Sequence, residues 1–402
     1  MNSPVVIEQS NQLLQALVDE GERVLGYIYP HIPLEIVMAH GLTPSVVRTN
    51  PAVVGAYEAS LQTFSCSLTR NLFSQRTSGS FPLLAGIVFS GNTCDALQNV
   101  GDVWRLRFPE DKVLRLTYPV GDAGESSVHF LTKEIEEFSA NLEQLSGTAF
   151  SDSAFRHAAA LLEMIRENLQ LLYAARLTNP SLISFNDLSD LVSDFLTAPT
   201  SKVLERVKGK RESVFSQLSD DRNTEVQRVK DSILSQNLIG SEFSIEVDGP
   251  RIVVAGGMVE PSTIAGLADG VQEVQDTTLV LDLLTYGFKT VFTPPVDTKG
   301  DPFGNSARSI LGAPGEPTQE GLPKRVAFLK DILRKFSVQG LILCEQSFCD
   351  PDEFEAPSLD RAAREVNVQT LKLPLDSEIS DRARLEGRIQ TFLETLDANQ
   401  ME

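Results

Sequence analysis

The chain has 402 residues, of which 42% are apolar and 22% are charged, values that suit a globular protein of two or three domains. Its formal net charge of −20 argues against binding to nucleic acid or to an anionic membrane surface, because phosphate contacts need clustered Lys and Arg. The sequence has no signal-peptide pattern and no apolar run near the roughly 20 residues that span a bilayer, so we expect a cytoplasmic protein outside the membrane.

The first 125 residues alternate between apolar, strand-like runs and amphipathic helical segments. In chain order the pattern predicts a helix over 6–24, a strand over 24–29, helices over 33–41 and 57–75, a strand over 86–89, a helix over 94–107 and a strand over 113–118. Such alternation with short turns is typical of a parallel, doubly wound sheet. We therefore expect an N-terminal α/β lobe over 1–125 that contains Cys66 and Cys94.

Helical periodicity dominates the next stretch, 126–245. The predicted helices there are 131–145, 153–177, 185–196 and 202–236. We interpret this stretch as a helical region that joins two lobes.

The α/β alternation returns over 246–402. Strands are predicted over 252–255, 278–281, 341–343 and 370–373, and helices from 261, over 323–336, from 351 and over 380–396. The loop over 293–319 is rich in Pro and Gly, and we expect it to cover a site or contact a partner. The expected fold class is α/β, with two doubly wound parallel-sheet lobes of Rossmann or flavodoxin type, the second of which contains Cys349.

One motif occurs in both lobes. Residues 86–95 read GIVFSGNTCD and residues 340–350 read GLILCEQSFCD, so each has a Gly, an apolar strand, a short polar loop and a Cys-Asp pair that opens a helix. Ligands bind beyond the carboxyl ends of parallel strands, and a helix N-terminus favours the thiolate, which is the form that binds metal. We expect Asp95 and Asp350 to cap or complement these helix starts.

A structural interpretation competes with this one. A buried cysteine is more often a small hydrophobic residue than a ligand, and an Asp at a helix start is usually only a cap. The repetition of the motif favours the ligand interpretation. The sequence has no CxxC pair, no HExxH among its four histidines, and no GxxxxGK[ST], GxSxG or strand-linked GxGxxG motif. We therefore do not expect this chain to bind and hydrolyse ATP itself.

Short motifs along nearly the whole chain resemble the 2-hydroxyacyl-CoA dehydratase D-component family, which includes the cluster-bearing subunits of ATP-dependent benzoyl-CoA reductase. They are GY at 26–27, IPLEI at 32–36, AHGLTP at 39–44, FSCS at 64–67 with Arg70, CD at 94–95 with Trp104 and Pro109, GDP at 300–302, SFCDP at 347–351, and Arg388, Phe392 and Leu396. Each motif is short, but together and in this order they are specific. The SFCDP motif is most similar to the smaller cluster subunit of benzoyl-CoA reductase.

The resemblance implies one [4Fe-4S] cluster held between the two lobes by Cys66, Cys94 and Cys349. Four irons and three thiolates leave one iron open. In the family's catalytic subunit this iron takes water or the thioester carbonyl of the substrate, and in the sister subunit it serves electron relay. Cys344 has no place in the family motif, and we expect it in the core or behind the ligands.

The resemblance also implies a subunit of a heterodimeric enzyme that eliminates water from a 2-hydroxyacyl-CoA. One electron on the thioester carbonyl forms a ketyl radical, which expels the α-hydroxyl and makes the β-proton acidic, and the electron returns at the end. The expected partners are a homologous second subunit, an ATP-dependent iron–sulfur activator protein and a CoA-thioester substrate. Three alternatives stay open: an aryl-CoA reductase of the benzoyl-CoA type, an electron-relay protein that does not bind substrate, and a relative without metal.

Acid–base residues are harder to assign. Glu35 lies in the family's Pro-x-Glu segment and is a candidate for proton transfer, although a carboxylate also suits the first turn of a helix. His31 is the second candidate, with Tyr29 beside it. The segments 281–287 and 312–317 depart from the family pattern, so the acyl group is not predicted. Three cations could meet CoA phosphates, although a solvated surface position is favoured for each: Arg70, Arg105 and Lys299.

Overall fold

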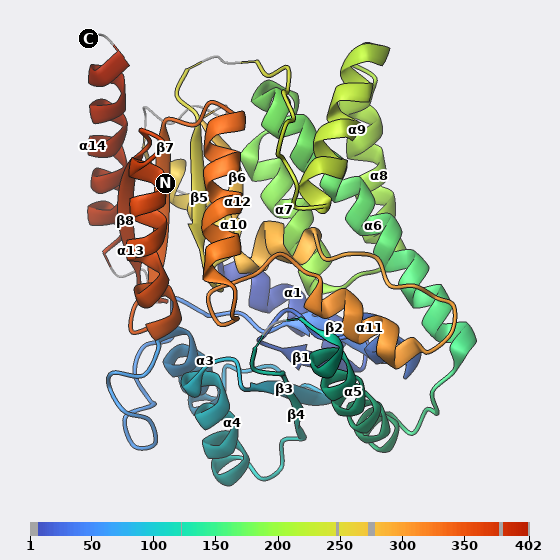
Figure 1. The fold of residues 1–402 in the computed structure, drawn as a ribbon. Helices are drawn as coiled ribbons and strands as arrows, with labels where there is room; N and C mark the ends of the chain where they lie inside the picture. Colours follow the sequence, from blue (N-terminus) through green and yellow to red (C-terminus); the bar gives the residue numbers. More distant parts are fainter. Residues whose placement is uncertain (1–6, 122, 247–248, 272–277, 378–380, 401–402) are drawn as a thin grey trace.

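The computed structural model describes residues 7–121, 123–246, 249–271, 278–377 and 381–400. Two four-stranded parallel sheets organise these residues, one in each lobe (Figure 1). The first sheet has the order β2-β1-β3-β4, with β1 Val24–Tyr27, β2 Thr43–Val46, β3 Gly86–Gly91 and β4 Val113–Thr117. The second has the order β6-β5-β7-β8, with β5 Ile252–Gly256, β6 Leu279–Leu283, β7 Gly340–Gln346 and β8 Gln369–Leu375. The expected fold class is confirmed.

Both sheets have the same topology, and it determines where a site forms. In each sheet the chain order reverses between the two central strands. Strand β1 is followed along the chain by its outer neighbour β2 on one side, and β3 by β4 on the other side; β5 with β6 and β7 with β8 repeat this pattern. A crevice opens at such a reversal, beyond the carboxyl ends of the strands. The loops that follow β1 and β3 in one lobe, and β5 and β7 in the other, therefore hold the residues best placed to bind a ligand.

Fourteen α-helices surround the sheets in the described part of the chain. Those of the N-terminal lobe are α1 Ile7–Asp19, α2 Leu34–Ala39, α3 Ser67–Ser78 and α4 Asp95–Arg107. The next five are α5 Glu125–Ser146, α6 Asp152–Thr178, α7 Phe185–Thr197, α8 Ser201–Phe215 and α9 Asp220–Leu234. The last five are α10 Pro261–Ala268, α11 Pro302–Leu311, α12 Leu322–Lys335, α13 Asp350–Arg364 and α14 Arg382–Gln400. Among these described helices, none is both long and apolar enough to cross a membrane.

The long helix α6 ties the two lobes together. It packs against α2 of the N-terminal lobe and against β6 of the C-terminal lobe, and its second half is buried almost without interruption. In Figure 1 the helices α6 to α9 stand beside the second sheet, and α5 lies against the first. The predicted helix starts at residues 6 and 380 lie outside the described residues.

Several predicted helices are wrong in their extent. The helix expected over 6–24 ends at Asp19, and the one expected over 131–145 begins at Glu125. Helix α3 begins at Ser67 rather than at 57, because the preceding residues form turns, such as the one closed by a 3.0 Å hydrogen bond from the Ser65 N–H to the Gln62 carbonyl. The single helix expected over 202–236 is interrupted after Phe215. Ser219 caps the following helix, α9, because its hydroxyl accepts a hydrogen bond of 3.4 Å from the Arg222 N–H.

Two elements escaped prediction. Strand β2 contains Pro44 and lies at the edge of its sheet, where a missing N–H donor is tolerated. Helix α11 lies inside the segment expected to be a loop over 293–319. Asp301 caps this helix by accepting a hydrogen bond of 3.1 Å from the Phe303 N–H, and Pro302 takes the first helical position.

A π-helical turn, η2 (Thr285–Lys289), follows β6 and has room only for glycine at position 287. A Cβ atom on Gly287 would lie 2.1 Å from Oδ1 of Asp282 and 2.7 Å from Cγ of Pro261.

We expect Gly287→Ala to lower the free energy of unfolding by about 2 kcal/mol, because overpacking forces its neighbours to move. Urea denaturation measures this change. Gly209→Ala is the control, since open space surrounds this exposed position in α8 and alanine there should stabilise by about 0.5 kcal/mol. Equal effects of the two substitutions would contradict the steric argument.

Candidate functional site

Three cysteines occupy equivalent positions at the starts of three helices. Cys66, Cys94 and Cys349 are the N-cap residues of α3, α4 and α13, and none of their side chains makes a capping hydrogen bond. All three line one cavity of about 390 Å³ between the two lobes. Cys66 and Cys349 are buried, with exposed fractions of 5% and 7%, and Cys94 is half-buried. The structure therefore brings together the three cysteines that the sequence singled out.

Helix N-termini act directly on these thiols. A hydrogen bond with Cys349 lowers the pKa of Cys66. Burial would raise this pKa, but the N–H groups of Leu68 and Thr69 at the start of α3 also lower it. The same hydrogen bond, with burial, raises the pKa of Cys349. Burial raises the pKa of Cys94 to about 12. A metal that binds these thiols would displace their protons, because the thiolate is the form that binds metal.

Two residues with left-handed backbone conformation precede the second and third cysteines. Asn92 has a φ of 60° two residues before Cys94, and Phe348 has a φ of 61° directly before Cys349. Asparagine tolerates this region, whereas for a bulky residue such as phenylalanine it is costly. Both loops of the repeated motif therefore use the same unusual backbone conformation to turn their cysteine toward the cavity between the lobes.

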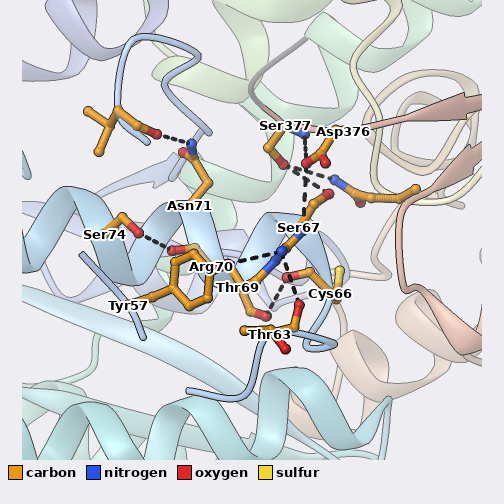
Figure 2. A network of polar contacts seen from close by, with 12 residues as sticks. Tyr57, Thr63, Cys66, Ser67, Thr69, Arg70, Asn71, Ser74, Asp376 and Ser377 are labelled. Carbon is orange, nitrogen blue, oxygen red and sulfur yellow. Dashed lines mark hydrogen bonds and ion pairs between the residues drawn. The ribbon is translucent and has the colours of Figure 1, made fainter. Parts of the chain in front are cut away.

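Polar contacts beside Cys66 join the two lobes (Figure 2). The N–H of Ser67 donates to the carbonyl of Ser347 at 3.0 Å, and the hydroxyl of Ser377 donates to that of Ser67 at 3.2 Å. Arg70 donates to the Tyr57 hydroxyl at 3.2 Å and to the Thr63 carbonyl at 3.1 Å.

Arg70 also reaches the second lobe. Its guanidinium lies 3.7 Å from Asp376 and 5.2 Å from the ring centre of Phe348, next to Cys349. The favoured solvated surface position is therefore wrong for Arg70, because these contacts leave its side chain only 11% exposed. Arg105 and Lys299 are exposed, as expected.

The three thiols form a donor set that a metal cluster could use. In the part of the chain that the structure describes, no group of three His, Cys, Asp or Glu side chains closes tightly enough around one metal ion. A cubane cluster carries its thiolates on different irons, so its ligands stand farther apart than those of a single ion. The three thiols line one cavity, but Cys66 and Cys349 are hydrogen-bonded to each other, so a cluster would have to separate them. Each lies at a helix start, where backbone N–H groups could donate to cluster sulfurs.

A second cavity, of about 770 Å³, adjoins the first. The residues that line both cavities are Thr93, Pro317, Thr318, Arg325 and Glu355. Pro317 and Thr318 belong to the segment that was expected to cover a site, and this expectation is confirmed. The walls of the larger cavity are mostly apolar and aromatic, with Tyr29, Tyr118, Phe288 and Phe328 among them. A ligand in the larger cavity would therefore lie next to the cavity that the three thiols line.

Three buried ionisable residues around the larger cavity escaped the sequence analysis. Glu316 accepts a hydrogen bond of 2.8 Å from the Tyr29 hydroxyl and another from Thr318. Asp352 accepts one of 3.3 Å from the Gln346 N–H, and burial raises its pKa to about 7. Lys289 lines the cavity wall with only 8% of its surface exposed. None of the three is marked by the repeated motif, whose first copy has Leu97 where the second has Asp352.

The two acid–base candidates lie elsewhere. Glu35 is buried in α2, where it accepts a hydrogen bond from the Ser306 hydroxyl of α11, and burial raises its pKa. His31 is buried and neutral, since burial and then the charge of Lys289 lower its pKa to about 3. Neither residue lines either cavity in the described part of the chain. The structure does not bring them to the thiols, and their catalytic assignment stays a prediction.

Cys344 differs from the other cysteines in its surroundings. It lies in β7 rather than at a helix start, and it packs in the core of the second sheet beside Ile342 and Val254. Burial raises the pKa of its thiol. It does not line the cavity of the other three cysteines.

The fold and the site define a class of two-lobed α/β proteins whose doubly wound sheets present cysteine thiols to a cavity between the lobes. A family profile described as "2-hydroxyglutaryl-CoA dehydratase, D-component" matches residues 30–396, so the chain belongs to this family. This confirms the resemblance found in the sequence.

Relatives match along almost their whole length. The (R)-phenyllactyl-CoA dehydratase beta subunit of Clostridium sporogenes is 20% identical over 98% of this chain and 96% of its own. The lactoyl-CoA dehydratase beta subunit of Anaerotignum propionicum is 22% identical over 94% of this chain and 93% of its own. A subunit of the benzoyl-CoA reductase of Thauera aromatica is 21% identical over 94% of this chain and 92% of its own.

Proposed function

We propose that Cys66, Cys94 and Cys349 hold one [4Fe-4S] cluster with an open iron, and that this chain is a subunit of a 2-hydroxyacyl-CoA dehydratase-type enzyme. The observation that carries the proposal is the convergence of three uncapped helix N-termini, each with a cysteine at its N-cap, on one cavity between the lobes. When bound, the cluster would supply single electrons at low potential to a thioester carbonyl.

The residues of this chain prepare that chemistry in three ways. The N–H groups at the starts of α3, α4 and α13 offset the negative charge of the thiolates, which the low polarity of the cavity would otherwise penalise. The lobe contacts around Ser67 and Arg70 keep the first and third cysteines at a constant separation. The adjoining cavity would take the acyl group of the thioester and exclude water from it.

The proposal includes two protein partners. The dehydratase relatives are named as beta subunits, which supports a homologous second subunit. The sequence has no phosphate-binding loop for ATP, which supports a separate ATP-dependent iron–sulfur activator as the electron donor. An aryl-CoA reductase is the second candidate function, because the benzoyl-CoA reductase relative is as similar to this chain as the dehydratase relatives are.

Anaerobic reconstitution and an electron count test the proposal. We expect a brown protein with about four irons per chain. With partner subunit, activator and a 2-hydroxyacyl-CoA, we expect an enoyl-CoA product with only catalytic amounts of electrons consumed. Stoichiometric electron consumption with an aromatic thioester would favour the reductase instead. A colourless protein after careful reconstitution would contradict both candidates.

A further inference from the structure

Lys289 is a buried cation in the wall of the larger cavity. It ends the turn η2, directly after the carboxyl end of β6, and its amine donates a hydrogen bond of 3.2 Å to the carbonyl of Gly256 at the end of β5. It therefore lies at the crevice edge of the second sheet, where ligands of doubly wound folds bind.

The turn that carries Lys289 is held in place by a buried carboxylate. Asp282 accepts hydrogen bonds of 2.9 Å from the Phe288 N–H, 3.3 Å from the Leu284 N–H and 2.6 Å from the Tyr173 hydroxyl. Gly287 fits against this carboxylate without a side chain. The position of Lys289 is thus fixed by the core on which the turn is built.

The hydrogen bonds of Lys289 are incomplete. An ammonium group has three donors, and the bond to Gly256 uses one of them. In the described residues no ion pair includes Lys289. The other two donors of this mostly buried amine need partners, which an oxygen of a bound ligand would provide in place of cavity water.

The charges around Lys289 indicate which oxygen it would accept. Glu355 is paired with Arg325 at 2.8 Å, and Glu316 receives hydrogen bonds from Tyr29 and Thr318. Burial and the charge of Arg325 lower the pKa of Lys289, and the three carboxylates of Glu355, Glu316 and Asp352 oppose this shift. A further anion would meet repulsion from them, so a neutral carbonyl or hydroxyl oxygen is the better ligand.

We propose that Lys289 binds an oxygen of the acyl group, either the thioester carbonyl or the 2-hydroxyl, in the larger cavity. This inference rests on the proposed function in that it takes an acyl-CoA as the ligand of the cavity. It makes Lys289 a binding residue that distinguishes oxygen-bearing acyl groups from plain alkyl groups, and it implies that this subunit itself receives substrate.

Calorimetric binding to the full chain, without cluster reconstitution, tests this with three probes. Lactoyl-CoA and propionyl-CoA differ by the 2-hydroxyl, and propionyl-CoA and S-propyl-CoA differ by the carbonyl. We expect the wild type to prefer the probe with the relevant oxygen about tenfold, and Lys289→Met to lose that preference while binding S-propyl-CoA within about twofold of the wild type. If Lys289→Met loses the preference for lactoyl-CoA over propionyl-CoA, the oxygen is the 2-hydroxyl. If it loses the preference for propionyl-CoA over S-propyl-CoA, the oxygen is the thioester carbonyl.

Two further variants complete the experiment. Lys330→Met, which removes a surface cation paired with Glu365, should leave every preference intact. Lys289→Gln, which keeps an N–H donor, should retain part of the preference. This result would show that the loss in Lys289→Met does not come from misfolding. If the wild type binds all three probes equally, or if Lys289→Met keeps the wild-type preference, the assignment is wrong. Iron content does not enter these measurements, so failure of the cluster proposal would be seen separately.

Discussion

Cys94→Ala should abolish the iron content of the reconstituted protein, whereas Cys344→Ala should retain about four irons per chain. This is the expected result because Cys94 supplies one of only three thiols in the cavity between the lobes. With two thiols left, the site keeps too few protein ligands to hold a cluster against exchange with solvent. Iron analysis and the visible absorption of anaerobic samples measure the effect.

The two variants make the same chemical change at different positions in the fold. Both remove one thiol, but Cys344 packs in the core of the second sheet, so its loss should cost stability through a small void and leave the cluster in place. Iron loss in Cys344→Ala with retention in Cys94→Ala would refute the assignment of ligands. Loss in both variants would show that the fourth cysteine is also needed.

Arg48→Met should lower the free energy of unfolding by about 3 kcal/mol, because removing one partner of a buried ion pair leaves the other charge unpaired. Arg48, just after β2, is only 3% exposed and lies 2.6 Å from Glu260 at the start of α10 in the other lobe. It also donates hydrogen bonds of 2.9 Å to the Thr197 hydroxyl and 3.0 Å to the Ser193 carbonyl of α7. One side chain thus connects the N-terminal sheet, the helical region and the C-terminal lobe.

Urea denaturation followed by circular dichroism measures this loss. Arg364→Met is the control, because Arg364 is 75% exposed and its pair with Asp360 lies on the surface of α13. We expect the control to change stability by less than about 0.5 kcal/mol. Glu260→Gln combined with Arg48→Met should cost less than the sum of the single changes, since the two residues act on each other. Full additivity would show that Arg48 acts through α7 alone.

The sequence by itself determined most of the strands and two of the three thiols. Strands such as β3, β5 and β7 are buried on both faces, so they appear as short continuous apolar runs that can be recognised locally. Cys94 and Cys349 each follow such a run at the start of a helix, which marks them without knowledge of the fold. Cys66 follows no strand of this kind, and only the resemblance to the family selected it.

The tertiary structure alone decided how these parts combine. Lys289 lies in a segment with no local signal, and it lines the larger cavity because the two lobes meet there. Glu316 lies in the segment expected to cover a site, but its hydrogen bond with Tyr29 of the other lobe could not be read from the sequence. Arg70 leaves the solvent because Asp376 and Phe348 approach it from residues about three hundred positions later in the chain. Local patterns report on which face of an element is buried. The partner across a cavity depends on distant packing, which no short stretch of sequence encodes.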